Sequence, residues 1–256
     1  MRLAGEGVLV TGSTAGIGRH VALMCAREGA AVAVHGRDSE RGAAVVREIA
    51  AAGGTATFLA ADLADEAACA GLVDRAAADL GGLTVLINNA VFSGETEDAA
   101  VGTLETAHWE RALRVNLSAV MWCTRAAVPH FRRAGHGSIV NVSSRQAERA
   151  GPGLTAYVTS KGGLNAFTRA VAVDYGREHI RCNALSVGYV LNPRRDGELS
   201  PTHRARLEGM HLTRLGQPDD VAYACVYLAS RESEFVTGAL LPVDGGGTIA
   251  RGLVLG

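Results

Sequence analysis

The stretch Val8-Leu-Val-Thr-Gly-Ser-Thr-Ala-Gly-Ile-Gly18 decides the fold, because a short apolar run leads directly into three closely spaced glycines. An apolar run of this length is typical of a strand buried on both faces of a parallel sheet. A helical pattern begins after Gly18. Strand, glycine turn and helix in this order let backbone amides approach a pyrophosphate at the helix N-terminus, although a simple tight turn would have a similar composition. The candidate pyrophosphate-binding residues are Gly12, Ser13, Thr14, Gly16, Ile17 and Gly18.

The rest of the chain repeats this alternation of strand and helix. We expect further strands at residues 31–35, 56–60, 84–87, 138–142, 180–185 and 240–243. Helices are expected at residues 39–52, in a segment ending near 80, and at 103–133, 155–177 and 218–230. Strict alternation predicts one doubly wound parallel sheet, a Rossmann fold of about seven strands with helices on both faces. We expect a single domain over residues 1–256, with the polar segment at about 188–215 as a candidate substrate lid.

Composition excludes several classes of partner. The net charge is -1 and the pI about 6.7, so no strong field attracts nucleic acid or an anionic membrane. The 5 cysteines are widely spaced and lack a C-x-x-C pair, which argues against a disulfide framework and a zinc site. No signal peptide or apolar run of membrane-spanning length is evident. We therefore expect a cytoplasmic protein without a bound metal.

The loop after the second expected strand indicates which dinucleotide is bound. An acidic residue at this strand end would favour NAD, but Gly36 and Arg37 come first and Asp38 follows. The planar guanidinium of Arg37 can pair with a ribose 2'-phosphate, which favours NADP(H) over NAD(H). The alternative is a solvated Arg37 at a helix start, with Asp38 or Ser39 as the N-cap.

Two further polar residues leave a structural and a functional interpretation open. Asp62, at the end of the third expected strand and followed by Leu63, is placed to accept from an adenine amino group. It could instead cap the next helix, as Asp65 could. Asn116 falls on or beside an apolar helical stripe, where a buried amide needs partners. Asn116 is therefore either a structural hydrogen-bond node or a site residue.

Lys161 is the only lysine in 256 residues, and Tyr157 stands four residues before it. Residues at this spacing share one face of a helix. A phenol is a poor acid–base catalyst at neutral pH unless a nearby positive charge stabilises its phenolate. Lys161 could supply that charge, whereas the alternative is a surface Tyr/Lys pair.

Taken together, these motifs resemble the short-chain dehydrogenase/reductase family from end to end. The resemblance rests on the ordered set Thr11-Gly12-x-x-x-Gly16-Ile17-Gly18, Asn88-Asn89-Ala90, Asn116, Ser144, Tyr157-x-x-x-Lys161, Thr237-Gly238 and Val243-Asp244-Gly245-Gly246. It implies hydride transfer between a nicotinamide and a carbonyl or alcohol carbon. By the same resemblance, Tyr157 would be the general acid or base and Ser144 would hold the substrate oxygen. Lys161 would lower the pKa of Tyr157 and hydrogen-bond the nicotinamide ribose, and Asn116 would organise a water that links Lys161 to solvent.

The resemblance also assigns cofactor contacts and shows three departures. The cofactor-binding set extends to Arg37, Asp62, Leu63, Asn89, Ala90, Tyr157, Lys161, Gly188, Val190 and Asn192. Val91 stands where the family usually has glycine, Val187 replaces the usual proline, and Asn192 replaces the usual threonine. A side chain at Val91 could crowd the nicotinamide or shape the substrate pocket, whereas Asn192 can still donate and accept.

These observations predict an NADP(H)-dependent reductase of a ketone or 3-oxoacyl type. The alternatives are an NAD-dependent alcohol or sugar dehydrogenase and a non-enzymatic dinucleotide-binding sensor or scaffold. Phe92, Gln146 and Tyr189 follow strand ends and are expected to line the pocket. The lid carries five arginines and three acidic residues, which favours a solvated loop, with an anionic or carrier-bound acyl substrate as the alternative. The family resemblance further implies a homotetramer.

Overall fold

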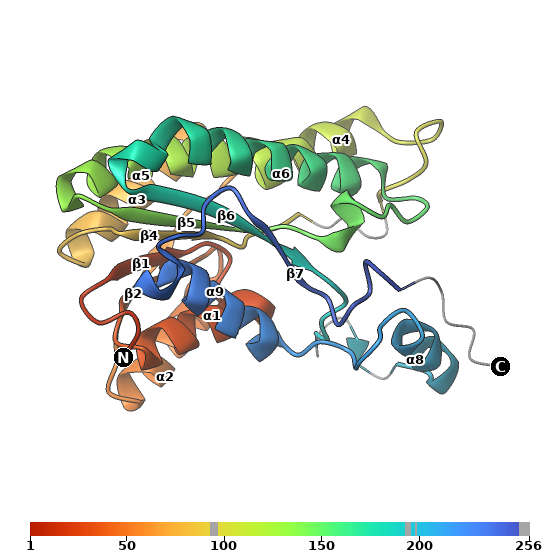
Figure 1. Ribbon diagram of the computed structural model, residues 1–256, viewed down its shortest axis with the longest axis horizontal. Coiled ribbons are helices and arrows are strands. Elements are labelled where there is room, and N and C mark those ends of the chain that lie inside the picture. The colour runs from red at the N-terminus through yellow and green to blue at the C-terminus, as the bar shows by residue number, and fades with distance from the viewer. Residues whose placement is uncertain (93–96, 193–195, 198, 251–256) are drawn as a thin grey trace.

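A computed structural model describes residues 1–92, 97–192, 196–197 and 199–250. Its centre is one seven-stranded parallel sheet with the strand order β3-β2-β1-β4-β5-β6-β7 (Figure 1). The strands are β1 (Gly7–Val10), β2 (Ala31–Gly36), β3 (Thr55–Ala60), β4 (Val85–Asn88), β5 (Gly137–Val142), β6 (Ile180–Val187) and β7 (Leu240–Val243). The predicted fold class, a doubly wound Rossmann-type sheet, is confirmed.

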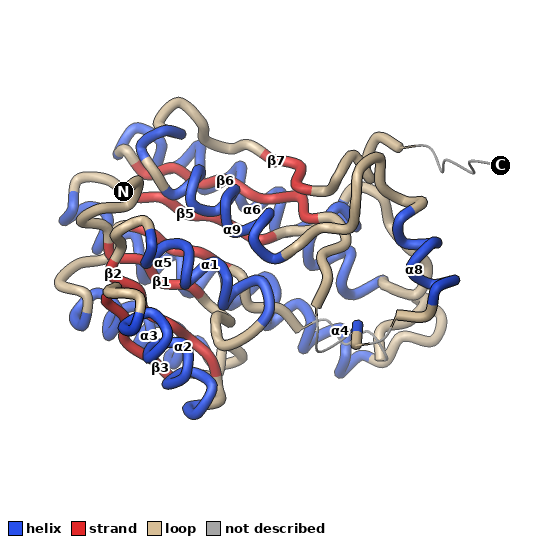
Figure 2. Tube along the Cα trace, turned by 90° about the horizontal axis from the view of Figure 1, so that it is seen from below, coloured by secondary structure: helices blue, strands red, loops and turns tan. Residues whose placement is uncertain are grey.

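Helices cover both faces of this sheet. They are α1 (Gly16–Arg27), α2 (Ser39–Ala51), α3 (Glu66–Asp79), α4 (Thr106–Leu113), α5 (Ala119–Ala134), α6 (Thr155–Tyr175) and α9 (Pro218–Ala229), whereas α8 (Pro201–Glu208) lies apart from these faces (Figure 2). In Figure 1, α1, α2 and α9 lie on one face and α4, α5 and α6 on the other. Each face has its own apolar core, because β1, β4 and β5 are buried on both sides and send alternate side chains into each layer.

Strand order fixes where a ligand can bind. From β1 the chain runs outward to β2 and β3, then returns to β4 on the other side of β1. The helices that follow β1 and β4 therefore diverge and leave a crevice at the carboxyl ends of these strands. Gly12, after β1, and Asn89, after β4, both lie at this edge, and the Asn89 side chain donates to the backbone oxygens of Thr11 (2.9 Å) and Gly12 (3.1 Å).

The segment predicted as one helix over residues 103–133 begins later and is not regular. α4 starts at Thr106, and a π-helical turn, Arg114–Ser118, joins it to α5. Apolar spacing could not reveal this turn, because a single widened turn preserves the buried stripe on either side of it. Turns of this kind occur often at functional sites, and this one contains Asn116.

The candidate lid over residues 188–215 contains α8. Figure 2 shows α8 beyond one end of the sheet, apart from the helices that pack on its faces. Two of the lid arginines, Arg194 and Arg195, together with Glu198, lie outside the described residues. The structure therefore places only five of the eight charged lid residues counted in the sequence.

Candidate active site

A cavity of about 1370 Å³ opens at the carboxyl edge of the sheet and gathers residues from most of the chain. Every residue proposed for the site from sequence lines it, except Ser13 and Asn116. The lining includes Gly12, Thr14, Gly16, Ile17, Gly18, Arg37, Asp62, Leu63, Asn89, Ala90, Ser144, Tyr157, Lys161, Gly188, Val190 and Asn192. Phe92, Gln146 and Tyr189 line the same cavity, as expected. Val91, one of the three departures, is 48% exposed and also lies on this wall.

The glycine loop is shaped to present backbone to this cavity. A Cβ on Gly12 would lie 2.8 Å from the Cα of Ala90, and one on Gly18 would lie 2.3 Å from the Gly12 oxygen. Both positions therefore require glycine for close packing. Gly16 has φ +51° and faces open space, with its nearest neighbour, Asn192 Nδ2, at 3.9 Å. Bare backbone at the start of α1 suits a pyrophosphate, so these residues fit a dinucleotide.

His35 and Ser13 hold this loop from behind, a role that the sequence did not reveal for His35. The Gly12 amide donates to His35 Nδ1 at 3.0 Å, and Nε2 of the same ring lies 3.3 Å from the Ala61 oxygen. Burial lowers the pKa of His35 to about 4, so the ring is neutral at neutral pH and can accept at Nδ1. The Ser13 hydroxyl donates to the Val10 oxygen and accepts from the His35 amide. Ser13 thus shapes the loop and does not line the cavity.

Lys161 is the most unusual charge in the site. Its side chain is buried and donates from Nζ to the Val142 oxygen at 2.7 Å, at the end of β5. Nζ also lies 5.9 Å from the centre of the Tyr157 ring. Burial lowers the pKa of Lys161 to about 8, which leaves the ammonium charged at neutral pH. A cation is therefore fixed between the sheet and a cavity-lining phenol, which is the arrangement needed to stabilise a phenolate.

Ser144 and Asn116 are the other two catalytic candidates. Ser144 follows β5, lines the cavity, and accepts from the Gln146 amide at 3.2 Å. Asn116 is fully buried in the π-helical turn, and its amide group exchanges two hydrogen bonds with the backbone of Phe92. Nδ2 of Asn116 also donates to Ser160 Oγ, which in turn donates to the backbone carbonyl oxygen of Tyr157. The side chain of Asn116 therefore connects the pocket wall to α6 as a hydrogen-bond node.

Asp98 is a second supporting residue that the sequence did not reveal. The residue before α6, Leu154, offers no side-chain cap. Asp98 caps this helix from a distant loop instead, accepting from the amides of Ala156 (3.1 Å) and Tyr157 (2.9 Å). A carboxylate at a helix N-terminus satisfies free amides and interacts favourably with the helix dipole. Asp98 thus ties the segment after β4 to the start of the Tyr157 helix.

Asp98→Ala is expected to lower the free energy of unfolding by about 1–2 kcal/mol, the usual value of a helix cap, and to lower kcat because Tyr157 loses its anchor. Urea unfolding and steady-state kinetics measure the two effects. Asp65→Ala is the matched control, because Asp65 caps α3 by accepting from the Ala68 amide, away from the cavity. The control should lose similar stability and keep full kcat. Equal kcat values in the two variants would contradict a positioning role for Asp98.

The opposite end of the cavity has the charges expected at an adenosine site. Asp38 caps α2 through the Arg41 amide and pairs with the Arg41 side chain at 2.5 Å. Arg37 is exposed and lines the cavity, and it forms no ion pair within the described ranges. Asp65 provides the α3 cap, while Asp62 accepts from the Ala64 amide and lines the cavity.

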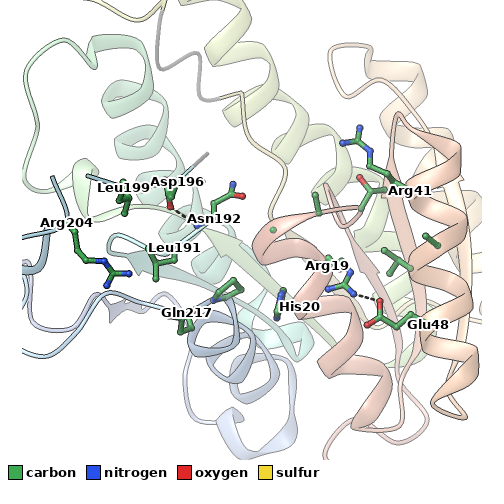
Figure 3. A pocket seen from close by; sticks show the side chains of 17 residues that line it. Arg19, His20, Arg41, Glu48, Leu191, Asn192, Asp196, Leu199, Arg204 and Gln217 are labelled. Carbon is green, nitrogen blue, oxygen red and sulfur yellow. Dashed lines mark hydrogen bonds and ion pairs between the residues drawn. The ribbon is translucent and has the colours of Figure 1, made fainter. Parts of the chain in front are cut away.

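A neighbouring pocket of about 860 Å³ continues from the glycine loop between α1, α2 and the lid (Figure 3). Arg19 pairs there with Glu48, and the backbone N–H of Asn192 donates to the Asp196 carboxylate at 2.7 Å. The lid therefore approaches the same glycine loop that lines the larger cavity.

Two classes of site find no support in the described part of the chain. No group of three or more His, Cys, Asp or Glu side chains there could hold a metal ion. None of the described helices has the length and apolar character needed to cross a membrane.

Comparison with known proteins agrees with this geometry. The profile of the family described as Enoyl-(Acyl carrier protein) reductase matches residues 12–248. The chain is 38% identical over 254 residues to 4-formylbenzenesulfonate dehydrogenase of Comamonas testosteroni, covering 97% of this chain and 100% of that protein. It is 33% identical over 246 residues to the 3-oxoacyl-[acyl-carrier-protein] reductase of Thermotoga maritima, covering 96% and 99%.

A solved structure is similar over the same length. The gluconate 5-dehydrogenase of Burkholderia cenocepacia, crystallised with NADP and tartrate, superposes with a TM-score of 0.91 at 32% identity, covering 98% of each chain. The family profile, the two relatives and this structure all extend across both the glycine loop and the Tyr157 helix. The chain is therefore an oxidoreductase-family protein that belongs to the short-chain dehydrogenases/reductases.

Proposed function

We propose that this protein is an NADP(H)-dependent oxidoreductase that transfers hydride between the nicotinamide and a carbonyl or secondary alcohol substrate. The observation that carries the proposal is the buried Lys161 ammonium, fixed on the Val142 oxygen and 5.9 Å from the Tyr157 ring. Burying a charge costs free energy. Next to a cavity-lining phenol, the charge can stabilise the phenolate, which is a chemical reason to retain it. Each of the three similar proteins is named for a reaction at a carbonyl or alcohol group, although their substrates differ otherwise. Their names therefore support the reaction class.

Each site residue would have a separate role in this reaction. The glycine loop, Asn89 and Arg37 would hold the dinucleotide, which when bound supplies or accepts the hydride. Ser144 would donate a hydrogen bond to the substrate oxygen. Tyr157 would give its proton to that oxygen in reduction and take it back in oxidation. Lys161 favours the phenolate left behind, because its charge lies beside the ring.

A screen of ketones, aldehydes and secondary alcohols that follows NADPH absorbance tests the reaction class. Turnover of at least one member in either direction is the expected result. NADPH binding without turnover across the panel would instead favour the dinucleotide-binding sensor or scaffold. Val91, Val187 and Asn192 motivate that alternative, but all catalytic candidates are retained.

The preference for NADP(H) rests on Arg37, which lines the cavity without an ion-pair partner in the described ranges. The neighbouring Arg41 is already paired with Asp38. We expect Arg37→Gln to weaken NADPH binding by about 10- to 100-fold, the value of one charged hydrogen-bond pair, and to leave NADH binding nearly unchanged. Fluorescence titration of both cofactors measures this. Arg47→Gln, on the helix α2 that follows Arg37 but outside the cavity lining, should change neither affinity. Equal affinity of the wild-type protein for both cofactors would refute the preference.

A further inference from the structure

The catalytic end of the cavity contains an arginine that the proposed reaction does not use. Arg145 directly follows Ser144, in the short 3-10 helix Arg145–Ala147, and lines the same cavity as Ser144 and Tyr157. A group bound by Arg145 would therefore lie close to Ser144, the residue proposed to hold the substrate oxygen.

The guanidinium of Arg145 is half-buried and poorly matched by its neighbours. Its contacts to Met210 are weak, because the thioether sulfur at 3.7 Å is a poor acceptor and the backbone oxygen lies at a long 3.4 Å. Hydrogen bonds weaken beyond about 3.2 Å. Burial lowers the pKa of Arg145, so its surroundings disfavour the charge that an arginine nevertheless keeps.

The nearest acidic group does not resolve this imbalance. Asp244 attracts Arg145 electrostatically, but the Asp244 carboxylate accepts from the amides of Gly246 (3.0 Å) and Thr248 (2.6 Å). Arg145 forms no ion pair in the part of the chain that the structure describes. A partly buried cation without a paired anion is unfavourable, and an anionic ligand would stabilise it.

A second cation lines the same cavity from α4. Arg111 lies over the ring of Phe92 at 5.2 Å, and both residues line the cavity. The two carboxylates of the lining lie elsewhere or have donors of their own. Asp62 belongs to the adenosine end, and Asp196 accepts from the Tyr189 hydroxyl at 2.8 Å.

We propose that Arg145 forms a carboxylate-binding subsite, so that the preferred substrate is a small carbonyl compound or alcohol that carries a carboxylate. The planar guanidinium matches a carboxylate through two parallel hydrogen bonds. The carboxylate would orient the reacting carbon towards Ser144 and Tyr157. This inference rests on the proposed function, because it names the substrate class of the same site.

The competing explanation is that Arg145 only holds Met210 and the lid. Four proteins separate the two roles: the wild type, Arg145→Gln, Arg145→Lys and Arg149→Gln. Arg149 is the matched control, because it donates to the backbone oxygens of Thr248 and Ala250 near the same tail and does not line the cavity. The probes are 4-formylbenzoate and its methyl ester, which present the same aldehyde with and without a charge.

The ratio of kcat/KM for the acid to that for the ester, measured with NADPH, is the first readout. We expect Arg145→Gln to lower this ratio by about 10- to 100-fold. Arg145→Lys should restore part of it, and Arg149→Gln, which removes only a repulsion on the Arg145 charge, should not lower it. A structural role would slow both aldehydes equally, so an unchanged ratio in Arg145→Gln would overturn the subsite.

Calorimetric titration of the enzyme–NADP complex with benzoate and with benzamide is the second readout, and it needs no turnover. Benzoate binding that exceeds benzamide binding and is lost in Arg145→Gln supports the subsite. If that binding is seen while neither aldehyde is reduced, the subsite stands and the proposed oxidoreductase function fails for these substrates. Benzoate binding that is absent, or independent of Arg145, overturns the subsite even if both aldehydes are reduced.

Discussion

Tyr157→Phe is expected to lower kcat by about 10³-fold, within the range of 10² to 10⁴ that a positioned acid or base contributes. The substitution removes one oxygen and keeps the ring beside Lys161. The helix start is also kept, because Asp98 binds the backbone amide of residue 157 and not its side chain. We therefore expect NADPH affinity to stay within about threefold of the wild type, a change of less than about 0.7 kcal/mol. Steady-state kinetics and fluorescence titration measure the two quantities.

Tyr175→Phe is the control for this change. Tyr175 ends the same helix, α6, away from the cavity lining; its ring packs against an apolar core and lies 5.6 Å from the guanidinium of Arg132. The control should turn over normally. Near-normal turnover in Tyr157→Phe would show that another group supplies the proton, whereas a matching loss of NADPH binding would show that Tyr157 serves the cofactor and not the proton transfer.

The parts of this site that could be predicted from the sequence are those encoded by neighbouring residues. The glycine loop is predictable because its strand, turn and helix are contiguous. The relation of Tyr157 to Lys161 is predictable because helical geometry places residues at this spacing on one face. The meeting of strand-end residues at the cavity is also predictable, because the carboxyl ends of parallel strands share one edge of the sheet.

The parts that could not be predicted depend on contacts between distant segments. Asp98 caps a helix that begins far along the chain, and no local pattern links it to Tyr157. His35 supports Gly12 only because β1 and β2 are adjacent in the sheet. No local sequence signal marks Arg145, and its weak partners, Met210 and Asp244, come from the lid and the tail. Such roles require the tertiary structure.

Lys161→Arg is expected to lower kcat by at least about 10²-fold, although it keeps a positive charge. The effect is comparable to removing one preorganised electrostatic group from an active site. The buried site holds a compact ammonium on the Val142 oxygen, and a planar guanidinium is larger and donates in a different geometry. Arg169→Lys, the reverse exchange elsewhere on α6, is the control and should retain activity. Near-normal kcat in Lys161→Arg would mean that the single lysine of the chain has no special role.

Lys161→Met separates the catalytic from the structural value of this charge. Burial lowers the pKa of Lys161 from 10.5 to about 8, so the folded protein holds its proton less tightly than the unfolded chain. At neutral pH both states are protonated, and the buried ammonium costs about 3 kcal/mol of folding free energy. This cost disappears as the pH rises from about 8 to 10.5, where the unfolded chain binds more protons.

Methionine removes both this cost and the hydrogen bond to the Val142 oxygen, which is worth about 1–3 kcal/mol when its loss leaves a buried acceptor unpaired. We therefore expect Lys161→Met to lose its activity and yet unfold in urea at pH 7 with a free energy no lower than that of the wild type. As the pH rises from 8 to 10.5, the free energy of unfolding of the wild type should increase relative to that of the variant. A variant that is clearly less stable at pH 7 would show that Lys161 stabilises the fold, and the argument for a charge retained for catalysis would fail.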